Sequence, residues 1–449
     1  MPRRRTERRG LRLWPVGTVL ILTFTTALLV AAAVFSTGWD LLGAHRLKPE
    51  HRIDSKTLFD LVKLSFGVVA GAGALVALVV AYRRQRVDED GALREATRLH
   101  TERFTTAVSQ LGEESAAVRL GGVHALASLA DDAPTRELRQ TCIDVLCAYL
   151  RLPYTAETDL PDGDTGARHT YRALREVRHT VIRLIRDHLR LPPEHPRSWQ
   201  GCDLDFTGVT FDGGDLTGAV FSGGNVSFAE AVFSGGAIDF IGAVFSGGNV
   251  SFRRAVFSGG AIDFNRAVFS AGNVSFIGAV FPGGLATFMN ATFSGGTVDF
   301  IGARFSSSMV YLTGARFSSG TVSFVGAEFS GGTIGLVGAV FSGGTVNFSD
   351  AVFSGATVNF NRADFSGATV NFIESDFSGD TVSFSNTVFS GGTVDFYSAT
   401  FSDGTADFSS ADFSGGTVNF SSATGEAPSG LPTSGSPPAG LLLPPTWTN

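Results

Sequence analysis

AVFSGGNVSFAE at residues 219–230 and AVFSGGAIDFIG at residues 231–242 are the first two of 17 consecutive dodecamers that run from Ala219 to Ser422. The first aromatic position of the dodecamer is Phe in all 17 units. The second is Phe in 15 units, with Leu312 and Leu336 as the exceptions. A period kept over such a length is typical of a repeat architecture, in which each unit buries its apolar side chains against its neighbours. A disordered low-complexity segment would not keep Phe at a fixed period.

The residues at the start of this region explain the spacing of the aromatic positions. Residues 204–223 read LDFTG, VTFDG, GDLTG and AVFSG, four pentapeptides centred on Phe206, Phe211, Leu216 and Phe221. This stretch resembles the pentapeptide-repeat family, whose unit has a small residue two positions before a central Leu or Phe and often Gly two positions after it. The resemblance implies a right-handed quadrilateral β-helix, with one pentapeptide on each of its four sides.

Each dodecamer then consists of two pentapeptides and a two-residue insertion, such as Gly224-Asn225. Identity recurs in every second dodecamer, because the dodecamers that begin at 219, 243 and 267 carry NVSF, whereas those at 231 and 255 carry AIDF. We therefore expect a coil of two dodecamers. The sequence predicts eight to nine such coils after one coil of plain pentapeptides.

Alternation along a strand places two residues of each pentapeptide inward, the central Phe and the residue two positions before it. The latter is Ala in almost every first pentapeptide and Val or Ile in nearly every second one. The residue directly before the central Phe should point outward. In the first six dodecamers it is Val, and with two dodecamers in each coil these valines form two columns: Val220, Val232, Val244, Val256, Val268 and Val280. Two interpretations stay open, since β-branched residues suit strands and an apolar column suits a partner.

Two uncharged segments near the N-terminus predict transmembrane helices. Residues 13–39 and 64–82 carry no charged side chain, and each matches the roughly 20 apolar residues that a helix needs to cross a bilayer. The second segment contains Gly67-x-x-x-Gly71, which permits a close helix–helix approach. Packing against the first span and formation of a homo-oligomer both stay open.

Basic residues favour one orientation of these spans. They cluster in residues 1–12 and directly after Tyr82, so the positive-inside rule places both termini in the cytoplasm and residues 40–63 in a short external loop. The excess of 32 Arg over 3 Lys favours a GC-rich bacterial genome. We therefore expect the plasma membrane of a bacterium.

Residues 83–199 predict a cytoplasmic, all-α linker domain. Apolar residues recur at helical spacing from Ala116 to Ala127 and from Leu138 to Tyr149, and a third helix is predicted from about Arg168 to Leu189. Arginines of the third helix fall within a stripe of about 80°: Arg168, Arg172, Arg175, Arg183, Arg186 and Arg190. Three interpretations stay open for this stripe: contact with anionic lipid, docking on an acidic partner such as the solenoid, or a solvated face.

Charge is divided unevenly along the chain. Residues 1–199 carry a net charge of +6, and residues 200–449 carry −13. Some pentapeptide-repeat proteins are DNA-shaped inhibitors of topoisomerases, so the resemblance and the acidic back half together keep a DNA mimic as an alternative function. Nucleic acid itself is not an expected partner of an acidic solenoid.

No motif in the chain predicts catalysis. All 8 His precede residue 196, and we find no His/Cys/acid cluster with metal-ligand spacing. We therefore predict no catalytic residue, no cofactor and no metal. Cys142 and Cys147 lie five positions apart on one helix and face apart, so these two and Cys202 are predicted to be reduced and structural.

The sequence thus predicts two transmembrane helices, an all-α linker domain over residues 83–199, and a β-helix over residues 200–422. Residues 423–449 are rich in Pro, Ser and Gly and are expected to be disordered. Their apolar residues could nevertheless cover the open end of the solenoid: Leu441, Leu442, Leu443 and Trp447. The predicted function is a membrane-anchored, non-enzymatic scaffold or protein-interaction module. Its expected partner is an unidentified protein, with no small-molecule substrate.

Overall fold

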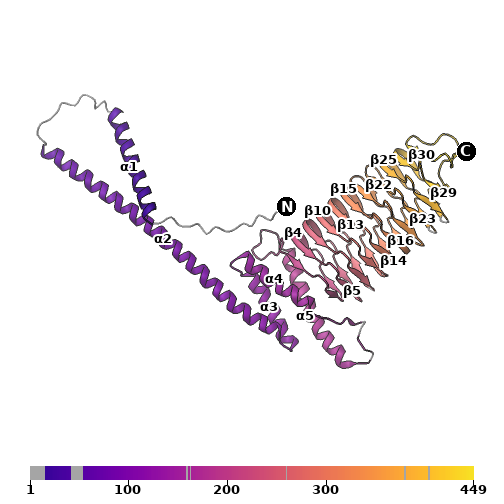
Figure 1. Cartoon of the computed structure of the whole chain (residues 1–449), viewed down its shortest axis with the longest axis horizontal. Helices are drawn as coiled ribbons and strands as arrows, with labels where there is room; N and C mark the ends of the chain where they lie inside the picture. Colours follow the sequence, from indigo (N-terminus) through magenta and orange to yellow (C-terminus); the bar gives the residue numbers. More distant parts are fainter. Residues whose placement is uncertain are drawn as a thin grey trace. The chain divides into compact units, whose positions relative to one another are not determined.

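The computed structural model describes residues 16–41, 54–157, 160–161, 163–258, 260–378, 381–402 and 405–448 (Figure 1). The chain divides into two compact units, residues 1–99 and residues 100–449. Helix α1 spans Val16–Leu41, and helix α2 spans Ser55–Leu111. The predicted basic tail at residues 1–12 lies outside the described residues, as does most of the predicted loop between the two apolar segments.

Helix α2 is a single helix of 57 residues. It contains the predicted span at residues 64–82 but also residues 55–63, which were expected in the external loop, and residues 83–111. No proline interrupts α2, and the charged residues after Tyr82 are good helix formers. The ends of the apolar segment therefore do not mark the ends of the helix.

The three helices expected in the linker domain are present as α3 (Ala116–Asp131), α4 (Arg136–Arg151) and α5 (Thr165–Arg190). Polar side chains cap two of them, because the Thr135 hydroxyl accepts a hydrogen bond from the Leu138 amide and the Asp164 carboxylate accepts one from the Ala167 amide. All three cysteines are free and buried, as predicted. Burial raises the pKa of the Cys142 thiol to about 11 and that of the Cys147 thiol to about 12.

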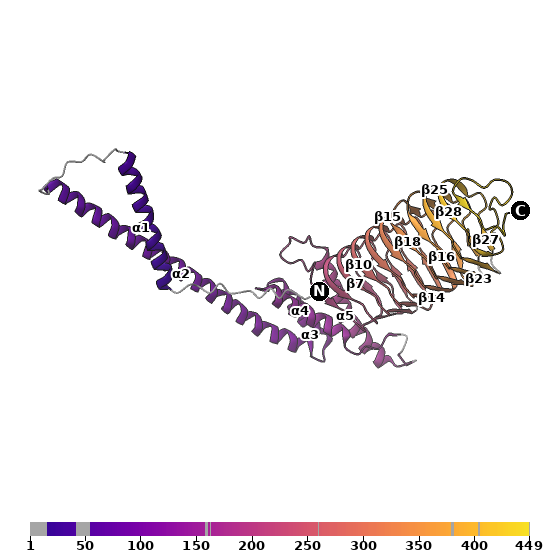
Figure 2. The same ribbon diagram turned by 45° about the horizontal axis from the view of Figure 1, so that its top comes forward.

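Residues 204–442 form a right-handed β-solenoid of about 10 turns, in which neighbouring strands pair in parallel (Figure 2). Val220 pairs with Val244 and Phe221 with Phe245, so one coil contains two dodecamers, as predicted. The first coil is shorter by one insertion, and Leu204 consequently lies opposite Val226.

The strands belong to two sheets, one for each dodecamer of the coil. The first sheet contains β1 (Leu204–Asp205), β4 (Val220–Ser227), β7 (Val244–Ser251), β10 (Val268–Ser275), β13 (Thr292–Asp299), β15 (Arg316–Ser323), β17 (Val340–Phe341), β18 (Thr345–Asn347), β21 (Asp364–Phe365), β22 (Thr369–Asn371), β25 (Val388–Asp395), β28 (Asp412–Asn419) and β30 (Leu441–Leu442). The second contains β2 (Thr210–Phe211), β3 (Gly214–Asp215), β5 (Val232–Ser234), β6 (Ile238–Asp239), β8 (Val256–Ser258), β9 (Ala261–Asp263), β11 (Val280–Phe281), β12 (Leu285–Thr287), β14 (Arg304–Tyr311), β16 (Glu328–Gly335), β19 (Val352–Ser354), β20 (Thr357–Asn359), β23 (Asp376–Ser378), β24 (Thr381–Ser383), β26 (Thr400–Ser402), β27 (Thr405–Asp407) and β29 (Thr424–Gly425).

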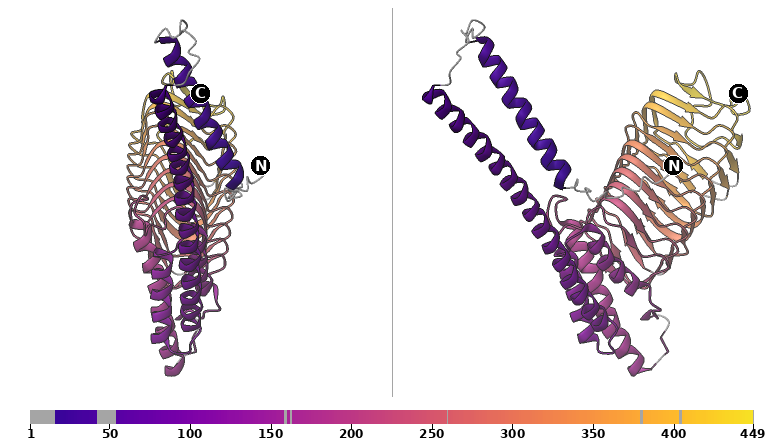
Figure 3. Two further views of the ribbon diagram at one scale, coloured as in Figure 1. Left: turned by 90° about the vertical axis from the view of Figure 1, so that its left-hand side faces the viewer. Right: turned by 60° about the vertical axis from the view of Figure 1, so that its left-hand side comes forward.

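Phenylalanine rings fill the interior of the solenoid as predicted. The stacked backbone coils that surround this interior can be followed in Figure 3. Rings one coil apart stack nearly parallel; Phe228 and Phe252, for example, have centroids 4.7 Å apart and planes 3° apart. Rings from different columns meet edge to face, as Phe228 and Phe240 do at 5.9 Å and 82°. Both arrangements are favourable for aromatic quadrupoles. The small interior position is Ala in most units, and Ser375 fits there because its hydroxyl donates to the Phe348 carbonyl at 2.7 Å.

Two glycines of the dodecamer 315–326 show how the corners are built. Both have a positive φ, +80° at Gly320 and +59° at Gly326. A Cβ at Gly326 would meet nothing within 4 Å, whereas a Cβ at Gly320 would lie 2.6 Å from the carbonyl oxygen of Gly296 in the preceding coil. At the position of Gly326, other dodecamers carry residues such as Arg254 and Glu374 at a similar φ. Other dodecamers carry Ser308, Ala356 and Ala368 at the position of Gly320, none of them with a positive φ. Glycine is therefore required at the insertion corner where the backbone has the conformation seen at Gly320.

The C-terminal tail is folded onto the last coil, so the prediction of disorder is wrong. Strand β30 pairs with β28, and β29 pairs with β26. The Trp447 side chain is 6% exposed, and its ring centroid lies 5.8 Å from that of Phe401 and 5.7 Å from that of Phe420. Its indole Nε1 donates to the Gly425 carbonyl at 3.0 Å. The hypothesis that the tail covers the open end is confirmed for Leu441, Leu443 and Trp447, whereas Leu442 is 48% exposed. A few apolar anchors suffice where a stack of rings would otherwise face water.

Candidate interaction surfaces

The helical domain closes the N-terminal end of the solenoid around one buried carboxylate. Asp212, directly after β2, is 6% exposed. Its Oδ2 accepts hydrogen bonds from the hydroxyls of Tyr154 and Tyr171, each at 2.6 Å, and lies 3.2 Å from Nε of Arg175. Its Oδ1 lies 3.2 Å from Nε2 of His179. Four side chains from α5 and the segment before it therefore converge on one residue of the first coil.

These contacts fix the protonation states at the junction. Burial alone would raise the pKa of Asp212, but the hydrogen bonds from His179, Tyr154 and Tyr171 outweigh burial and hold that pKa well below its usual range. Burial, and then the hydrogen bond to Asp212, raises the pKa of Tyr171 to about 12 and pushes the pKa of Tyr154 far above its ordinary value. At neutral pH the Asp212 carboxylate is ionised, and the side chains around it donate hydrogen bonds to it. Such an arrangement holds two domains together.

Arg178 crosses the same junction. This residue is 4% exposed, and its guanidinium donates to the carbonyl oxygens of Leu150 and Thr210, each at 2.7 Å. Its guanidinium carbon lies 4.1 Å from the centre of the Tyr154 ring, a cation–π contact. Burial lowers the pKa of Arg178, although an arginine stays protonated at neutral pH.

The six arginines of the predicted stripe divide into two groups. Three contact the first coil: Arg175 pairs with Asp212, Arg186 pairs with Asp215, and Arg190 donates to the Thr217 carbonyl at 2.6 Å. The other three are exposed: Arg168, Arg172 and Arg183. Arg183 forms an ion pair with Glu176 on its own helix at 2.8 Å. The first three arginines thus contact the acidic solenoid. Contact of the other three with lipid stays a prediction.

No motif in the sequence predicts the cluster of Asp212, Tyr154 and His179. The available cue was that Arg178 and His179 interrupt the apolar side of α5 between Val177 and Val181. Polar groups on a buried side need partners. Which residue supplies the partner depends on a contact between α5 and the first coil, and no local pattern specifies that contact.

The two valine columns exist in the predicted register. Val220, Val244 and Val268 are paired in the first sheet, and Val232, Val256 and Val280 in the second. All six are half-buried. The columns end where Thr292 and Arg304 take the next positions. A role of these valines in partner binding stays a prediction.

A more exposed apolar surface lies on the second sheet, and we call Leu285, Met289, Met309 and Tyr311 the methionine patch. Leu285 pairs with Met309 across β12 and β14. Met289 is 38% exposed and Met309 is 46% exposed. The Tyr311 hydroxyl donates to the Met309 sulfur at 3.4 Å. A Cβ at Gly335 would lie 2.8 Å from the Tyr311 ring, so glycine in the next coil leaves room for that ring.

The methionine patch does not follow from the repeat pattern, because its residues lie outside the column of residues that precede each first Phe. The available cue was that both methionines of the repeats, Met289 and Met309, lie in successive coils of the same sheet, with Met309 one coil after Leu285. Methionine side chains adapt their shape and occur often at binding surfaces.

Comparison with known proteins matches residues 216–262 to the family described as Pentapeptide repeats (9 copies). The solenoid is built from pentapeptide repeats. No curated protein and no solved structure matches the chain. The matched residues cover about two coils, and the same register continues to the pairing of Val394 with Val418 in the pentapeptide-repeat domain.

Acidic residues of the pentapeptide-repeat domain form one short ladder beside the junction. Asp215, Asp239 and Asp263 are stacked in successive coils of the second sheet. Burial, and then repulsion by Asp263 and Asp215, raises the pKa of Asp239. Asp215 is paired with Arg186, and Thr287 takes the next position. Within the described residues, no group of His, Cys, Asp and Glu is arranged to hold a metal ion.

Proposed function

We propose that this protein is a membrane-anchored, non-enzymatic interaction module whose pentapeptide-repeat domain binds a protein partner through the methionine patch. The observation that carries the proposal is the exposure of Met289 and Met309 on a solenoid whose neighbouring outward positions are mostly Ser, Thr, Asn and Asp. Adaptable apolar side chains on a rigid polar scaffold are typical of protein-binding surfaces. The repeat ladder supplies the rigidity, since each coil is hydrogen-bonded to the next.

One helix supports the membrane anchor. Among the described residues, only α2 is long and apolar enough to cross a membrane, by length and composition. The segment expected as the first span is helical as α1, and two spans remain part of the proposal. Arginines directly after Tyr82 favour placing the pentapeptide-repeat domain in the cytoplasm of a bacterial cell.

Two observations support a non-enzymatic role. The one cluster that combines Tyr, His, Asp and Arg side chains within the described residues, at Asp212, has its donors and acceptors used by one another at a domain junction. The pKa shifts there move Asp212 and the two tyrosines away from neutrality, whereas acid–base catalysts need a pKa near the working pH.

Proximity labelling in the native cell tests the proposal, with the labelling enzyme fused to the C-terminus of the full chain. We expect one set of cytoplasmic proteins to be enriched by the wild type and lost when Met289→Ser and Met309→Ser are combined. Ile301→Ser is the matched control, because Ile301 is 39% exposed but lies outside the methionine patch. Equal labelling by the double variant and the control would refute the patch, and labelling of external proteins would refute the orientation.

The alternative is a DNA mimic, and it rests on the net charge of −13 in residues 200–449. Competition with duplex DNA for a bacterial topoisomerase tests it, with the full chain in lipid nanodiscs. Inhibition at micromolar protein that is lost in Asp239→Asn with Asp263→Asn would favour the mimic. Undiminished supercoiling activity would exclude it.

A further inference from the structure

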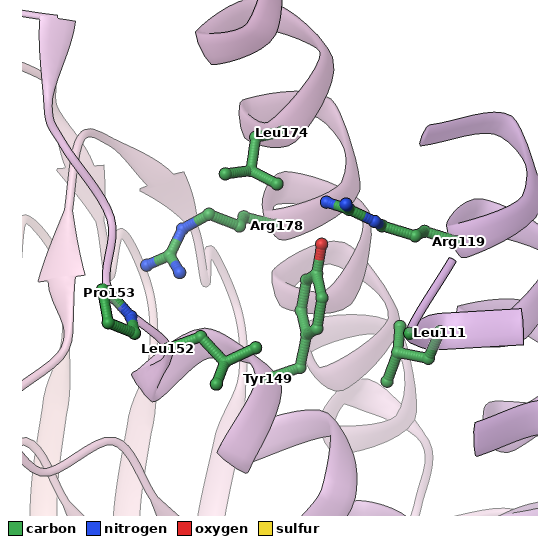
Figure 4. Close-up of a pocket in the computed structure, with 8 residues that line it drawn as sticks. Leu111, Arg119, Tyr149, Leu152, Pro153, Leu174 and Arg178 are labelled. Atoms are coloured by element: carbon green, nitrogen blue, oxygen red, sulfur yellow. The ribbon is translucent and has the colours of Figure 1, made fainter. Parts of the chain in front are cut away.

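Four helical segments enclose a cleft of about 220 Å³ on the helical domain (Figure 4). Its walls are apolar and come from the end of α2, the segment after α4, and α5: Leu111, Leu152, Pro153 and Leu174. Leu152 is 57% exposed, whereas Leu111 is 6% exposed. The cleft therefore reaches from solvent into the apolar core of the domain.

A hydroxyl inside this cleft has no partner. Tyr149 is 8% exposed, and its hydroxyl oxygen is buried without a hydrogen bond among the described residues. Figure 4 shows this hydroxyl pointing toward the guanidinium of Arg119, whereas the guanidinium of Arg178 extends away from it toward Pro153. Buried polar groups are nearly always satisfied, so an orphan hydroxyl in an open cleft points to a ligand atom.

Arg119 supplies the positive charge that faces the Tyr149 hydroxyl, whereas the Arg178 guanidinium is used at the domain junction. Arg119 donates to the Glu113 carbonyl, and Arg178 donates to the carbonyls of Leu150 and Thr210. Neither guanidinium has an ion-pair partner in the part of the chain that the structure describes. The Arg119 guanidinium has five N–H donors, and several remain for a ligand. The planar guanidinium group of arginine can donate two parallel hydrogen bonds to the oxygens of a carboxylate or a phosphate.

We propose that this cleft binds a small anion that carries a carboxylate or phosphate group on a short apolar body. The anionic oxygens would accept from the Tyr149 hydroxyl and from the Arg119 guanidinium, and the apolar body would lie against Leu111 and Leu174. The space corresponds to about seven water molecules of about 30 Å³ each, which fits a single ring or a short chain. Such a ligand would add an effector site to the proposed interaction role, and it does not depend on the methionine patch.

Ligand-observed NMR titration of the full chain in lipid nanodiscs tests the proposal, with empty nanodiscs as the blank. Benzoate and phenyl phosphate are the probes. Benzamide has the ring without the charge, and acetate has the charge without the ring. We expect at least one anionic probe to bind at least about tenfold more tightly than both of these controls, because a charge-assisted hydrogen bond and the apolar contact are each absent from one of them. The ratio of benzoate to phenyl phosphate affinity identifies the anionic group.

Two variants distinguish the cleft from general attraction of anions. Arg119→Gln and Tyr149→Phe should each weaken the preferred probe about tenfold. Arg253→Gln and Tyr397→Phe, on exposed solenoid turns, should leave it unchanged. Tyr149→Phe removes a hydroxyl without a partner among the described residues, so its melting temperature should equal or exceed that of the wild type, and lost binding would not reflect unfolding. Benzamide binding as tightly as the anions would overturn the proposal. So would equal affinity in the cleft variants and their controls, or no binding at all.

Discussion

Substituting Gly320 and Gly326 separately by alanine tests how the coils are built, because the two glycines belong to one dodecamer and differ in only one respect. Both have a positive φ, but only Gly320 faces the backbone of the preceding coil, where a Cβ would lie 2.6 Å from the Gly296 carbonyl oxygen. Gly326 has open space at the same position. The difference between the two variants therefore measures the close approach of the coils.

The magnitudes follow from these contacts. At Gly326, a left-handed alanine costs about 1–2 kcal/mol, and the reduced entropy of the unfolded chain returns about half of this, so the net loss is about 1 kcal/mol. At Gly320, the Cβ must also move roughly 0.7 Å from the carbonyl oxygen to reach an ordinary carbon–oxygen distance. This displacement would strain the pairing of Thr321 with Thr297. Loss of one or two ladder hydrogen bonds adds about 1 kcal/mol each, so we expect a total of about 2–4 kcal/mol.

Chemical denaturation of the purified full chain, followed by the β-sheet band in far-UV circular dichroism, measures both variants. The wild type and Gly326→Ala should unfold at similar denaturant concentrations, and Gly320→Ala should unfold clearly earlier. If the two alanine variants lose the same free energy of unfolding, glycine at the insertion corner is explained by φ alone. The argument from close approach would then be wrong.

Four further outcomes are expected. Asp212→Asn should destabilise the junction by about 3 kcal/mol, since it removes the charge of a buried network. In the wild type, the depressed pKa of Asp212 predicts that this stabilisation is present above about pH 4 and is lost as the pH falls below it. Urea titrations of both proteins at several pH values check both expectations. Phe324→Leu should cost about 1 kcal/mol and Phe324→Ala about 3–5 kcal/mol in the same assay, because Phe324 stacks on both neighbouring coils. Trp447→Ala should expose the last phenylalanine rings and speed amide hydrogen exchange at Val418. Unchanged exchange would show that Trp447 does not protect the last coil. Asp239→Asn should stabilise the protein at neutral pH, because the raised pKa of Asp239 means that its charged form is disfavoured in the folded state. The difference in stability between the variant and the wild type should disappear as the pH falls through that pKa.

The solenoid interior could be predicted from the sequence because its rule is local and repeated. Phe at a fixed period, with Ala or Val two positions before it, determines which side chains point inward and which residues meet one coil later. Pairings such as Phe221 with Phe245 follow from that period alone. Even Leu312 and Leu336 fit, since both occupy buried ring positions.

Features that depend on a single long-range contact could not be predicted. The ordered C-terminal tail rests on Trp447 and Leu441, which contact Phe420 and Val418 of the last coil, and its Pro-rich composition is typical of disorder. The Asp212 cluster likewise joins residues 33 to 58 positions apart. Such contacts depend on which surface α5 covers, and that surface is chosen by tertiary packing.

Closure at both ends restricts where the pentapeptide-repeat domain can bind a partner. An open solenoid end presents unpaired backbone groups and is a ready site for end-to-end association. Here α5, through residues such as Arg178, covers the first coil, and β30 and Trp447 cover the last coil. Both ends of the solenoid are therefore occupied by the chain's own residues. What remains accessible within residues 100–449 is the lateral surface and the helical domain. Since Met309 is the most exposed large apolar residue among the described repeats, a partner bound to this domain is expected to approach from the side of the second sheet.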